Sequence, residues 1–412
     1  MPLRKAAWLM VMGLVLGSGQ AVVAGHDGVP RLDPDYGKPV DAWWSTHPFN
    51  PHSANYDPNI RSPEPRIDVA EVHKANPNSL TAGIEEALAM LPVAGGTLFF
   101  PKAHGVYEIT HPHQAIRNRY HSNARIQIVR RSNIHFLSDG ARLKGTALLR
   151  IASMEFADKK TEDNPVRNFY FQNLTLDCDG DASFINCDGV RDVVFDNCTF
   201  TNLGPKTANY APAVVYGIAK SDNWWLRNCT FNMAKGQWGF HPDGQRGSGV
   251  IGCKFVGNCP AAIMVFTNDD VDRRWGGYLI FANNTFEGTY SDAAIAMGAA
   301  QTLIAGNSVT GPTKYFVRSD GKQSAFKHEY KYSGNQIIGN TLENVKTILR
   351  VQGALEMGTP YKIGQYTVRG NRITGMEKPV FEEIRAPGHT VDGPNVVEDN
   401  GPEVEPGKYW KK

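Results

Sequence analysis

A short phrase that recurs along the C-terminal half of the chain constrains its fold more than any other feature. In each copy, two or three apolar residues precede a polar residue, then Asn or Gly, then Cys or Asn, and finally a polar and an apolar residue. An earlier, less regular copy is Phe171–Leu176. The regular copies are Val194–Phe200, Trp225–Phe231, Val250–Phe255, Ile280–Phe286, Ile304–Val309, Ile337–Leu342 and Val368–Ile373. A repeat of 23 to 33 residues is typical of a solenoid.

Each copy of the phrase predicts two short strands joined by a tight bend. Asn and Gly tolerate the left-handed backbone conformation that such a bend requires. The repeat is too short for a strand, a helix and a second parallel strand, but it accommodates three short strands with their turns. Stacked coils then place parallel strands about 4.8 Å apart, and parallel crossovers are right-handed almost without exception. The sequence therefore predicts an all-β, single-stranded, right-handed parallel β-helix over residues 76–395.

One position of the phrase predicts a column of side chains inside the coil. Asparagines stacked in register can hydrogen-bond to one another, which offsets the cost of burying their amides. The cysteines of this column are expected to pack as small buried side chains. Short-loop disulfides Cys178–Cys187 and Cys253–Cys259 are conceivable, but free thiols are the prediction, and no Cys or His spacing suggests zinc. The column comprises Cys198, Cys229, Cys253, Asn284, Asn307, Asn340 and Asn371.

Three other segments flank the predicted solenoid. Residues 1–24 have the pattern of an export signal, since Arg4 and Lys5 precede an apolar stretch too short to span a bilayer and Ala24 suits a cleavage site. Residues 25–75 are irregular and rich in proline and aromatic residues, and 396–412 form a tail. Apolar spacing over Ser79–Leu91 predicts a short amphipathic helix that caps the first coil. We expect a secreted or periplasmic protein without a transmembrane segment.

Composition and charge exclude several classes of function. Hydrophobic residues make up 41% of the chain and charged residues 20%, which fits neither a disordered protein nor a membrane bundle. Without Arg4 and Lys5, the 43 Lys and Arg residues fall to 41 and equal the 41 Asp and Glu residues. A neutral protein without a basic stripe is not expected to bind nucleic acid. No glycine-rich loop opens a helix after a strand, which argues against nucleotide-dependent chemistry.

Two further segments carry a resemblance to a known family. Gly95–Ile109 (GGTLFFPKAHGVYEI), Asn133–Gly145 (NIHFLSDGARLKG) and the NCTF-type coils resemble the pectate-lyase-like superfamily of right-handed parallel β-helices, over about residues 76–390. The resemblance implies a carbohydrate-active protein. The chain lacks the Asn-Thr-Asp, Gly-Asp-Asp and Gly-His-Gly signatures of polygalacturonases and the paired arginines around a proline of pectate lyases, so the subfamily stays unassigned.

The third strand of each coil forms the substrate groove in that superfamily, and the sequence is most polar in the turns that follow it. We expect these strands within Ala213–Ile218, Gln237–His241, Ala261–Phe266, Ala293–Met297, Ala325–Lys327, Thr347–Val351 and Val380–Ile384. The catalytic candidates are His241, Asp243, Asp269, Lys327 and Arg350. The substrate-binding candidates are Trp238, Arg246, Asn268, Arg273, Arg274 and Gln352.

These candidates allow more than one chemistry. Asp269 and Asp270 could bind Ca²⁺, which prefers oxygen ligands and would neutralise a uronate carboxylate while Lys327, Arg350 or His241 removes the C5 proton. Asp243 and Asp269 could instead lie roughly 5–10 Å apart, as in glycoside hydrolases. The leading prediction is a lyase of an acidic polysaccharide. A hydrolase with paired aspartates and a non-catalytic glycan-binding protein are the alternatives, and monomer and homotrimer are equally compatible with the sequence.

Overall fold

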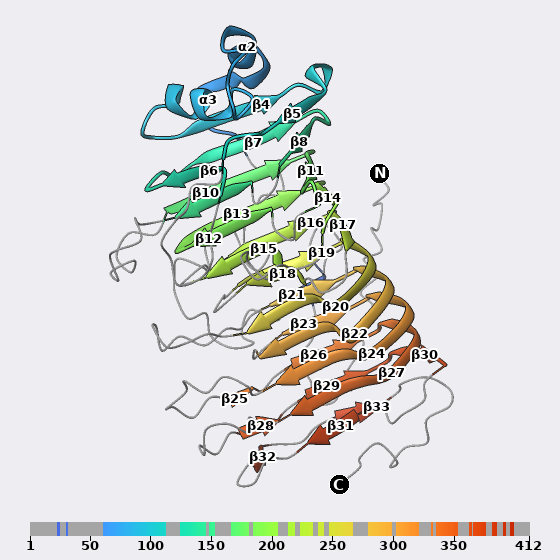
Figure 1. Ribbon diagram of the computed structural model, residues 1–412. Helices are drawn as coiled ribbons and strands as arrows, with labels where there is room; N and C mark the ends of the chain where they lie inside the picture. The colour runs from blue at the N-terminus through green and yellow to red at the C-terminus, as the bar shows by residue number, and fades with distance from the viewer. Residues whose placement is uncertain are drawn as a thin grey trace, which may run out of the picture.

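The chain winds into a right-handed parallel β-helix, as predicted, with strands stacked coil upon coil along one axis (Figure 1). The computed structural model describes residues 61–112, 124–145, 148–152, 166–180, 184–204, 213–218, 223–233, 238–242, 247–266, 279–298, 302–320, 331–332, 335–352, 362–364, 366–375, 381–384, 390–392 and 396–398, with 23–24 and 30–31. The expected export signal lies outside these residues except for Val23 and Ala24. No helix among the described residues is long and apolar enough to cross a membrane.

The first strands of the coils form one 12-stranded sheet, here called the first ladder. Neighbouring strands within this sheet all pair in parallel. In order, its strands are β3 (Arg66–Asp68), β4 (Gly96–Phe100), β7 (Ile134–Ser138), β10 (Val166–Gln172), β13 (Val190–Asp196), β16 (Trp224–Arg227), β19 (Gly249–Ile251), β21 (Ile280–Ala282), β23 (Leu303–Ala305), β26 (Asn335–Ile338), β29 (Tyr366–Arg369) and β33 (Val396–Glu398).

The second and third strands of the coils belong to one 16-stranded sheet that folds around the coil axis. The second ladder contains β5 (Val106–Glu108), β8 (Arg142–Lys144), β11 (Thr175–Asp177), β14 (Thr199–Thr201), β17 (Thr230–Met233) and β30 (Arg372–Thr374). The third ladder contains β6 (Ile126–Val129), β9 (Leu149–Ala152), β12 (Ile185–Asp188), β15 (Ala213–Ile218), β18 (Trp238–Pro242) and β31 (Phe381–Ile384). Four long bent strands belong to both ladders: β20 (Lys254–Phe266), β22 (Thr285–Gly298), β24 (Ser308–Asp320) and β27 (Thr341–Gln352).

The predicted tight bends join the first ladder to the second. The residue before each column position has a left-handed backbone, as at Asn197 with φ 51° and Gly306 with φ 63°. Asn173, Asn197 and Asn228, which match glycosylation triplets, are therefore turn residues of this kind. Because Asn and Gly adopt positive φ at the lowest cost, the sequence could specify these bends locally.

The interior column and the aromatic stacks hold the coils in register. The side-chain oxygen of each column asparagine accepts hydrogen bonds from the preceding coil, and Asn284, Asn307, Asn340 and Asn371 are almost fully buried. All six cysteines are free and buried, as predicted. Two runs of stacked phenylalanine rings pack in the core, one being Phe136, Phe171 and Phe195 and the other Phe200, Phe231, Phe255 and Phe286.

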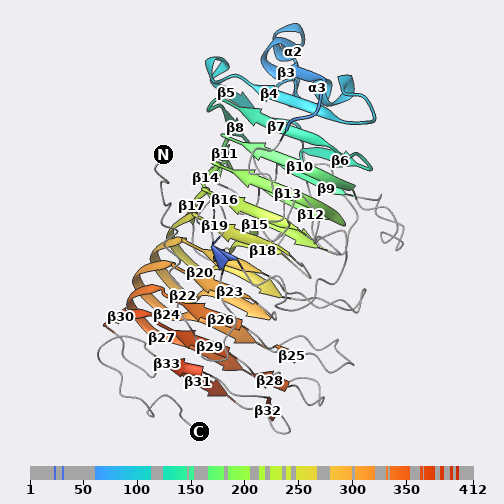
Figure 2. The same ribbon diagram turned by 180° about the vertical axis from the view of Figure 1, so that it is seen from behind.

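Helices α2 (Val69–Ala75) and α3 (Ile84–Met90) lie at the N-terminal end of the stack (Figures 1 and 2). The predicted helix over Ser79–Leu91 is shorter in the structure, because residues 79–83 form turns and Gly83 has φ 81°. Leu80, expected on the apolar face of the helix, lies in that turn and is half exposed. Three minor elements are the 3-10 helix η1 (Lys102–His104), the pair β1 (Val23–Ala24) and β2 (Pro30–Arg31), and a sheet of β25 (Lys331–Tyr332), β28 (Lys362–Gly364) and β32 (Thr390–Asp392).

Candidate functional site

Between β15 and β27, the outer face of the third ladder carries one row of side chains that changes from aromatic to cationic along the helix axis. Val215, Phe240, Ile263, Ile295, Val317 and Leu349 belong to the main core. The residue after each of them forms the outer row. In strand order from β15 to β27, this row is Tyr216, His241, Met264, Ala296, Arg318 and Arg350. The same register position is held by Gln127, Arg150 and Asn186 on the preceding strands and by Glu382 on β31. Neighbouring members are one strand spacing, about 4.8 Å, apart.

Aromatic rings surround His241 at the N-terminal end of this row. The ring centroid of His241 lies 5.1 Å from that of Tyr216 and 5.0 Å from that of Trp238. His241 is only 7% exposed, and Trp238 is partly buried. Trp238, a predicted sugar-stacking residue, therefore packs its ring against the predicted catalytic histidine.

Small apolar residues occupy the middle of the outer face. Ala261, Met264, Ala293, Ala296 and Tyr315 form a buried cluster separate from the main core, and Trp238 packs against it. The alanines bring no polar group to this part of the face, so acid–base or ionic chemistry among the described residues must lie at either end of the row.

Two arginines face the same way at the C-terminal end of the row. Arg318 of β24 and Arg350 of β27 are register partners. Nη1 of Arg318 pairs with Oδ2 of Asp292, and Nη1 of Arg350 donates a hydrogen bond of 3.0 Å to the phenol oxygen of Tyr315. The guanidinium carbon of Arg350 also lies 5.0 Å from the centroid of the Tyr315 ring. Like charges directly opposite one another destabilise a sheet, and Asp292 supplies an anion to Arg318 on this face.

A cavity of about 370 Å³ opens beside these arginines. It lies where β22, β24 and β27 bend from the second ladder into the third. Residues 289–291, 312–315 and 346–347 line it. Lys314 and Lys346 are its charged residues and are both exposed. Its volume falls within the range of small-ligand sites.

The structure separates the two predicted catalytic residues that it describes. His241 and Arg350 occupy the same register position, but four strand steps, or about 19 Å at 4.8 Å each, lie between them. They cannot contact one reacting carbon together. Gln352 ends β27, and its backbone pairs with Asp320 and Ile384. Asp243, Arg246, Asn268, Asp269, Asp270, Arg273, Arg274 and Lys327 lie outside the described residues.

One strand assignment made from sequence was wrong, and it concealed functional candidates. The third strand of the eighth coil was expected at Ala325–Lys327, but Tyr315 pairs with Ala293 and with Thr347, so this strand is the second half of β24. The bend at residues 310–313 does carry a turn signal, Gly311-Pro312, but it was not used to place the third strand. Arg318 and Tyr315 were missed for this reason, although Lys314 and Arg318 recur one coil later as Lys346 and Arg350.

The described residues do not provide a metal site. Within the parts of the chain that the structure describes, no group of three or more His, Cys, Asp or Glu side chains could hold a metal ion. Asp269 and Asp270, the predicted calcium ligands, lie outside these parts, so their role stays a prediction.

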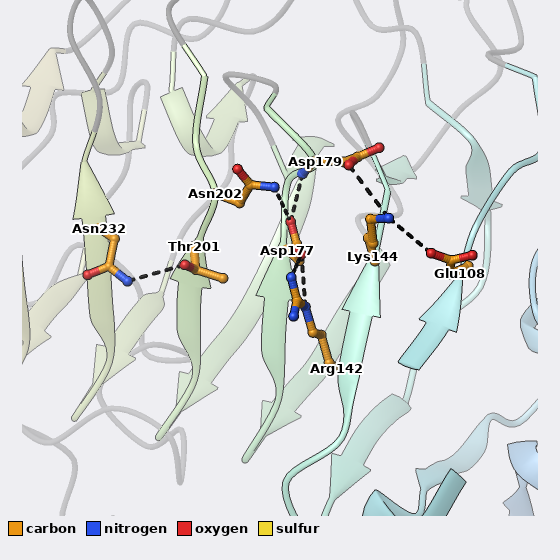
Figure 3. A network of polar contacts seen from close by, with 8 residues as sticks. All are labelled: Glu108, Arg142, Lys144, Asp177, Asp179, Thr201, Asn202 and Asn232. Atoms are coloured by element: carbon orange, nitrogen blue, oxygen red, sulfur yellow. Dashed lines mark hydrogen bonds and ion pairs between the residues drawn. The ribbon is translucent and has the colours of Figure 1, made fainter. Parts of the chain in front are cut away.

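A second polar cluster lies on the second ladder, away from the arginine face (Figure 3). The buried carboxylate of Asp177 accepts hydrogen bonds from Nε of Arg142 at 2.8 Å, from Nδ2 of Asn202 at 3.0 Å and from the Asp179 N–H at 2.9 Å. Lys144 pairs with Glu108 at 2.9 Å and with Asp179 at 3.8 Å.

The electrostatics of this cluster indicate a structural role. Burial alone would raise the pKa of Asp177, but the donors from Arg142, Asp179 and Asn202 lower it below its ordinary value. A carboxylate held ionised by three donors is a poor general acid. Each carboxylate of the cluster is matched by a cation on a neighbouring strand, so the network ties β5, β8 and β11 together.

Comparison with known proteins finds similarity of fold but assigns no activity to this chain. No family model matches the chain, and no curated protein matches its sequence. Among solved structures, the chain is similar to ORF18 of Geobacillus virus E2, with 11% identity and a TM-score of 0.46 over 77% of this chain and 59% of that one. The chain thus spans less than two thirds of that protein.

Two other solved structures cover more of their own length. A hyperthermoactive exopolygalacturonase from Thermotoga maritima matches with 11% identity and a TM-score of 0.49, over 79% of this chain and 92% of that one. A mutant tailspike protein of E. coli bacteriophage HK620 in complex with a hexasaccharide matches with 15% identity and a TM-score of 0.42, over 91% and 74%. At such identities the likeness concerns fold alone, and the assignment of the fold rests on the strand register described above.

Proposed function

We propose that this protein is a carbohydrate-active enzyme that binds an acidic polysaccharide along the outer face of the third ladder and cleaves it by β-elimination. The observation that carries the proposal is the repeated cation pair of two adjacent strands. Lys314 and Arg318 of β24 recur as Lys346 and Arg350 of β27, and the two arginines are register partners. Arg318 pairs with Asp292, and Glu382 of β31 is the register partner of Arg350 on the next strand.

The arrangement suits an anionic polymer better than a neutral one. Two guanidinium groups about one strand spacing apart repel each other, and because Asp292 already pairs with Arg318, a substrate carboxylate would act chiefly at Arg350. Guanidinium groups bind carboxylates in a bidentate geometry and are always charged. Arg350 is therefore better suited to neutralise a uronate carboxylate than to act as the base that the sequence analysis considered.

β-Elimination needs a base near that carboxylate. The base removes the proton from C5, the electron pair forms a double bond between C4 and C5, and the C4–O4 bond breaks while O4 acquires a proton. The neutralised carboxylate stabilises the charge that develops at C5. Tyr315, whose phenol oxygen contacts Arg350, is the described side chain with a titratable oxygen at this point. We propose Tyr315 as the base, with Lys327 as the alternative.

The test is a parallel measurement of two products. The protein is incubated with polygalacturonate, alginate and a neutral glucan, with calcium or with a chelator, and absorbance of unsaturated uronate ends is followed together with new reducing ends. Equal increases of both on a uronate polymer support the lyase. Reducing ends without absorbance would overturn it in favour of a hydrolase, for which Asp243, Asp269 and Asp270 are the candidate acids.

Variants connect the activity to this face. Arg350→Gln should lower kcat/KM on the uronate polymer at least a hundredfold, because it removes a charge-assisted contact to the reacting sugar. Arg372→Gln, the same change at an exposed position of the second ladder, serves as the matched control. Loss of activity on chelation would support calcium at Asp269 and Asp270. Retention of the polymer without any cleavage would instead indicate a glycan-binding protein.

A further inference from the structure

The cavity at the bends of β22, β24 and β27 has features that the proposed cleavage does not use. Thr313 pairs with Val345, and Tyr315 pairs with Thr347, so Lys314 and Lys346 lie opposite each other on adjacent strands. Nζ of Lys314 lies 5.3 Å from the centroid of the Tyr315 ring. All nine lining residues belong to the described part of the chain, and none of these nine carries a carboxylate.

The lining also contains buried hydroxyl groups without a partner. Thr313 and Thr347 are both fully buried, and neither Oγ1 atom has a hydrogen-bond partner. Leaving a buried hydroxyl unsatisfied costs roughly 1–3 kcal/mol. Thr313 shares its register position with Tyr290 and Val345 of the main core and so lies on the inner side. Valine has the same shape as threonine without this cost, so Thr347 indicates a ligand that supplies the missing partner. Thr347 shares its register position with Tyr315, which belongs to the outer apolar cluster, and therefore lies on the outer side of the bend.

Charge around the cavity selects the kind of ligand. Lys314 and Lys346 give it two positive charges, whereas Asp292, which follows the lining residue Ser291, is already paired with Arg318. Paired lysines attract a compact anionic group, and hydroxyls of threonine exchange hydrogen bonds with the hydroxyls of a sugar. The volume of about 370 Å³ is at the lower end of ligand sites.

We propose that this cavity is a binding subsite for one anionic sugar unit. Its carboxylate or sulfate group contacts Lys314 and Lys346, while a ring hydroxyl hydrogen-bonds to Thr347. The inference deepens the proposed function, since it places a charged unit of the same polymer next to the unit at Arg318 and Arg350. It differs from that function in requiring no bond cleavage.

Calorimetric titration of the full chain tests the subsite with defined probes. The probes are trigalacturonate, its fully methyl-esterified form and a sulfated neutral trisaccharide. We expect binding of the two anionic probes and at least tenfold weaker binding of the ester. Preference for trigalacturonate over the sulfated probe identifies a carboxylate site, and the reverse preference identifies a sulfate site. Equal binding of the ester and the anionic probes overturns the proposal.

Lysine variants with a matched control localise the binding. Lys314→Gln and Lys346→Gln should each weaken the anionic probes at least tenfold, since each removes a hydrogen bond to a charged group. Lys74→Gln, the same change on exposed α2, should leave binding unchanged. Unchanged binding in both cavity variants overturns the proposal.

Thr347→Val supplies a readout that a structural role would not give. If the hydroxyl serves a ligand, the isosteric change weakens the anionic probes severalfold and leaves thermal stability equal or higher, because it removes an unsatisfied buried group. Reduced stability with unaltered binding assigns Thr347 to the fold and contradicts the subsite.

The outcomes also separate this inference from the proposed cleavage. Lysine-dependent binding without any elimination retains the subsite and rejects the lyase. Elimination whose KM is unaffected by Lys346→Gln retains the lyase and rejects the subsite.

Discussion

The phenol oxygen of Tyr315 accepts a hydrogen bond of 3.0 Å from Nη1 of Arg350, which lies on the next coil. This contact joins a titratable oxygen to a cation that can bind a uronate carboxylate. Tyr315→Phe removes only that oxygen. We expect kcat on the susceptible uronate polymer to fall by a factor of about 10²–10⁴, the usual contribution of a general base. The initial rate at which the absorbance of unsaturated ends increases, at the same substrate concentration for both proteins, measures this change. A rate within threefold of that of the unmodified protein would exclude Tyr315 as the base.

The interior column predicts a large stability loss on removal of one amide. Oδ1 of Asn307 accepts hydrogen bonds from the backbone N–H and from Nδ2 of Asn284, at 2.9 and 3.0 Å. Asn307→Ala leaves the buried N–H without a partner and opens a small void, so the free energy of unfolding should decrease by about 2–4 kcal/mol. Urea denaturation measures the change. Asn232→Ala, at an exposed asparagine of the second ladder, should cost less than about 0.5 kcal/mol, and similar losses in both variants would argue against the column.

Close backbone packing at the bends predicts that Gly288 cannot be replaced. Its φ is 136°, and a Cβ atom there would overlap the carbonyl oxygen of Gly257 on the preceding coil. Gly288→Ala should therefore destabilise the protein by about 3 kcal/mol or more and reduce the soluble yield. Gly105 also has a positive φ, 88°, but no atom lies close enough to clash with a Cβ. Gly105→Ala therefore measures the cost of the backbone conformation alone, which should be only about 1 kcal/mol. Equal thermal midpoints of the two variants would contradict the close approach.

His135 predicts that stability falls in mildly acidic solution. Burial lowers the pKa of His135 from 6.5 to about 4, and a hydrogen bond with Asn168 opposes this only in part. The unfolded chain therefore binds a proton between pH 6.5 and about 4 that the folded protein excludes. The contribution of neutral His135 to the free energy of unfolding is fully present above pH 6.5. It is lost as the pH falls towards 4, by up to about 3 kcal/mol.

Urea denaturation across that range measures the effect, with His135→Gln as the comparison. Glutamine does not titrate, so the variant should show a flatter dependence of unfolding free energy on pH between 6.5 and 4. An unchanged slope in the variant would assign the acid sensitivity to other groups.

The bends of the coil were predictable because they are specified locally. Asn197 and Gly306 precede column residues, and both adopt the left-handed backbone that few other residues tolerate. The period of the phrase then fixed the stacking of Cys198 to Asn371, since parallel coils leave each column residue directly above its equivalent.

The candidate site was less accessible to sequence analysis. The bend of β24 is made by a continuous strand with a register shift between Thr310 and Thr313, and the Gly311-Pro312 pair at this bend was not used to separate its two halves. The third strand was consequently expected too late in the chain, at Ala325–Lys327. His241 and Arg350 were expected near one sugar, but the axial distance between their coils keeps them apart.

The repeat alone determined that this chain coils into parallel strands and that asparagines and cysteines of one column stack inside, because both properties follow from local backbone preference and a recurring phrase. Only the tertiary structure decided which cations share a face and where the cavity lies. A contact such as Tyr315 with Arg350 depends on the register and bend of two strands one coil apart, and a displacement by one residue would turn these side chains to the other face of the sheet.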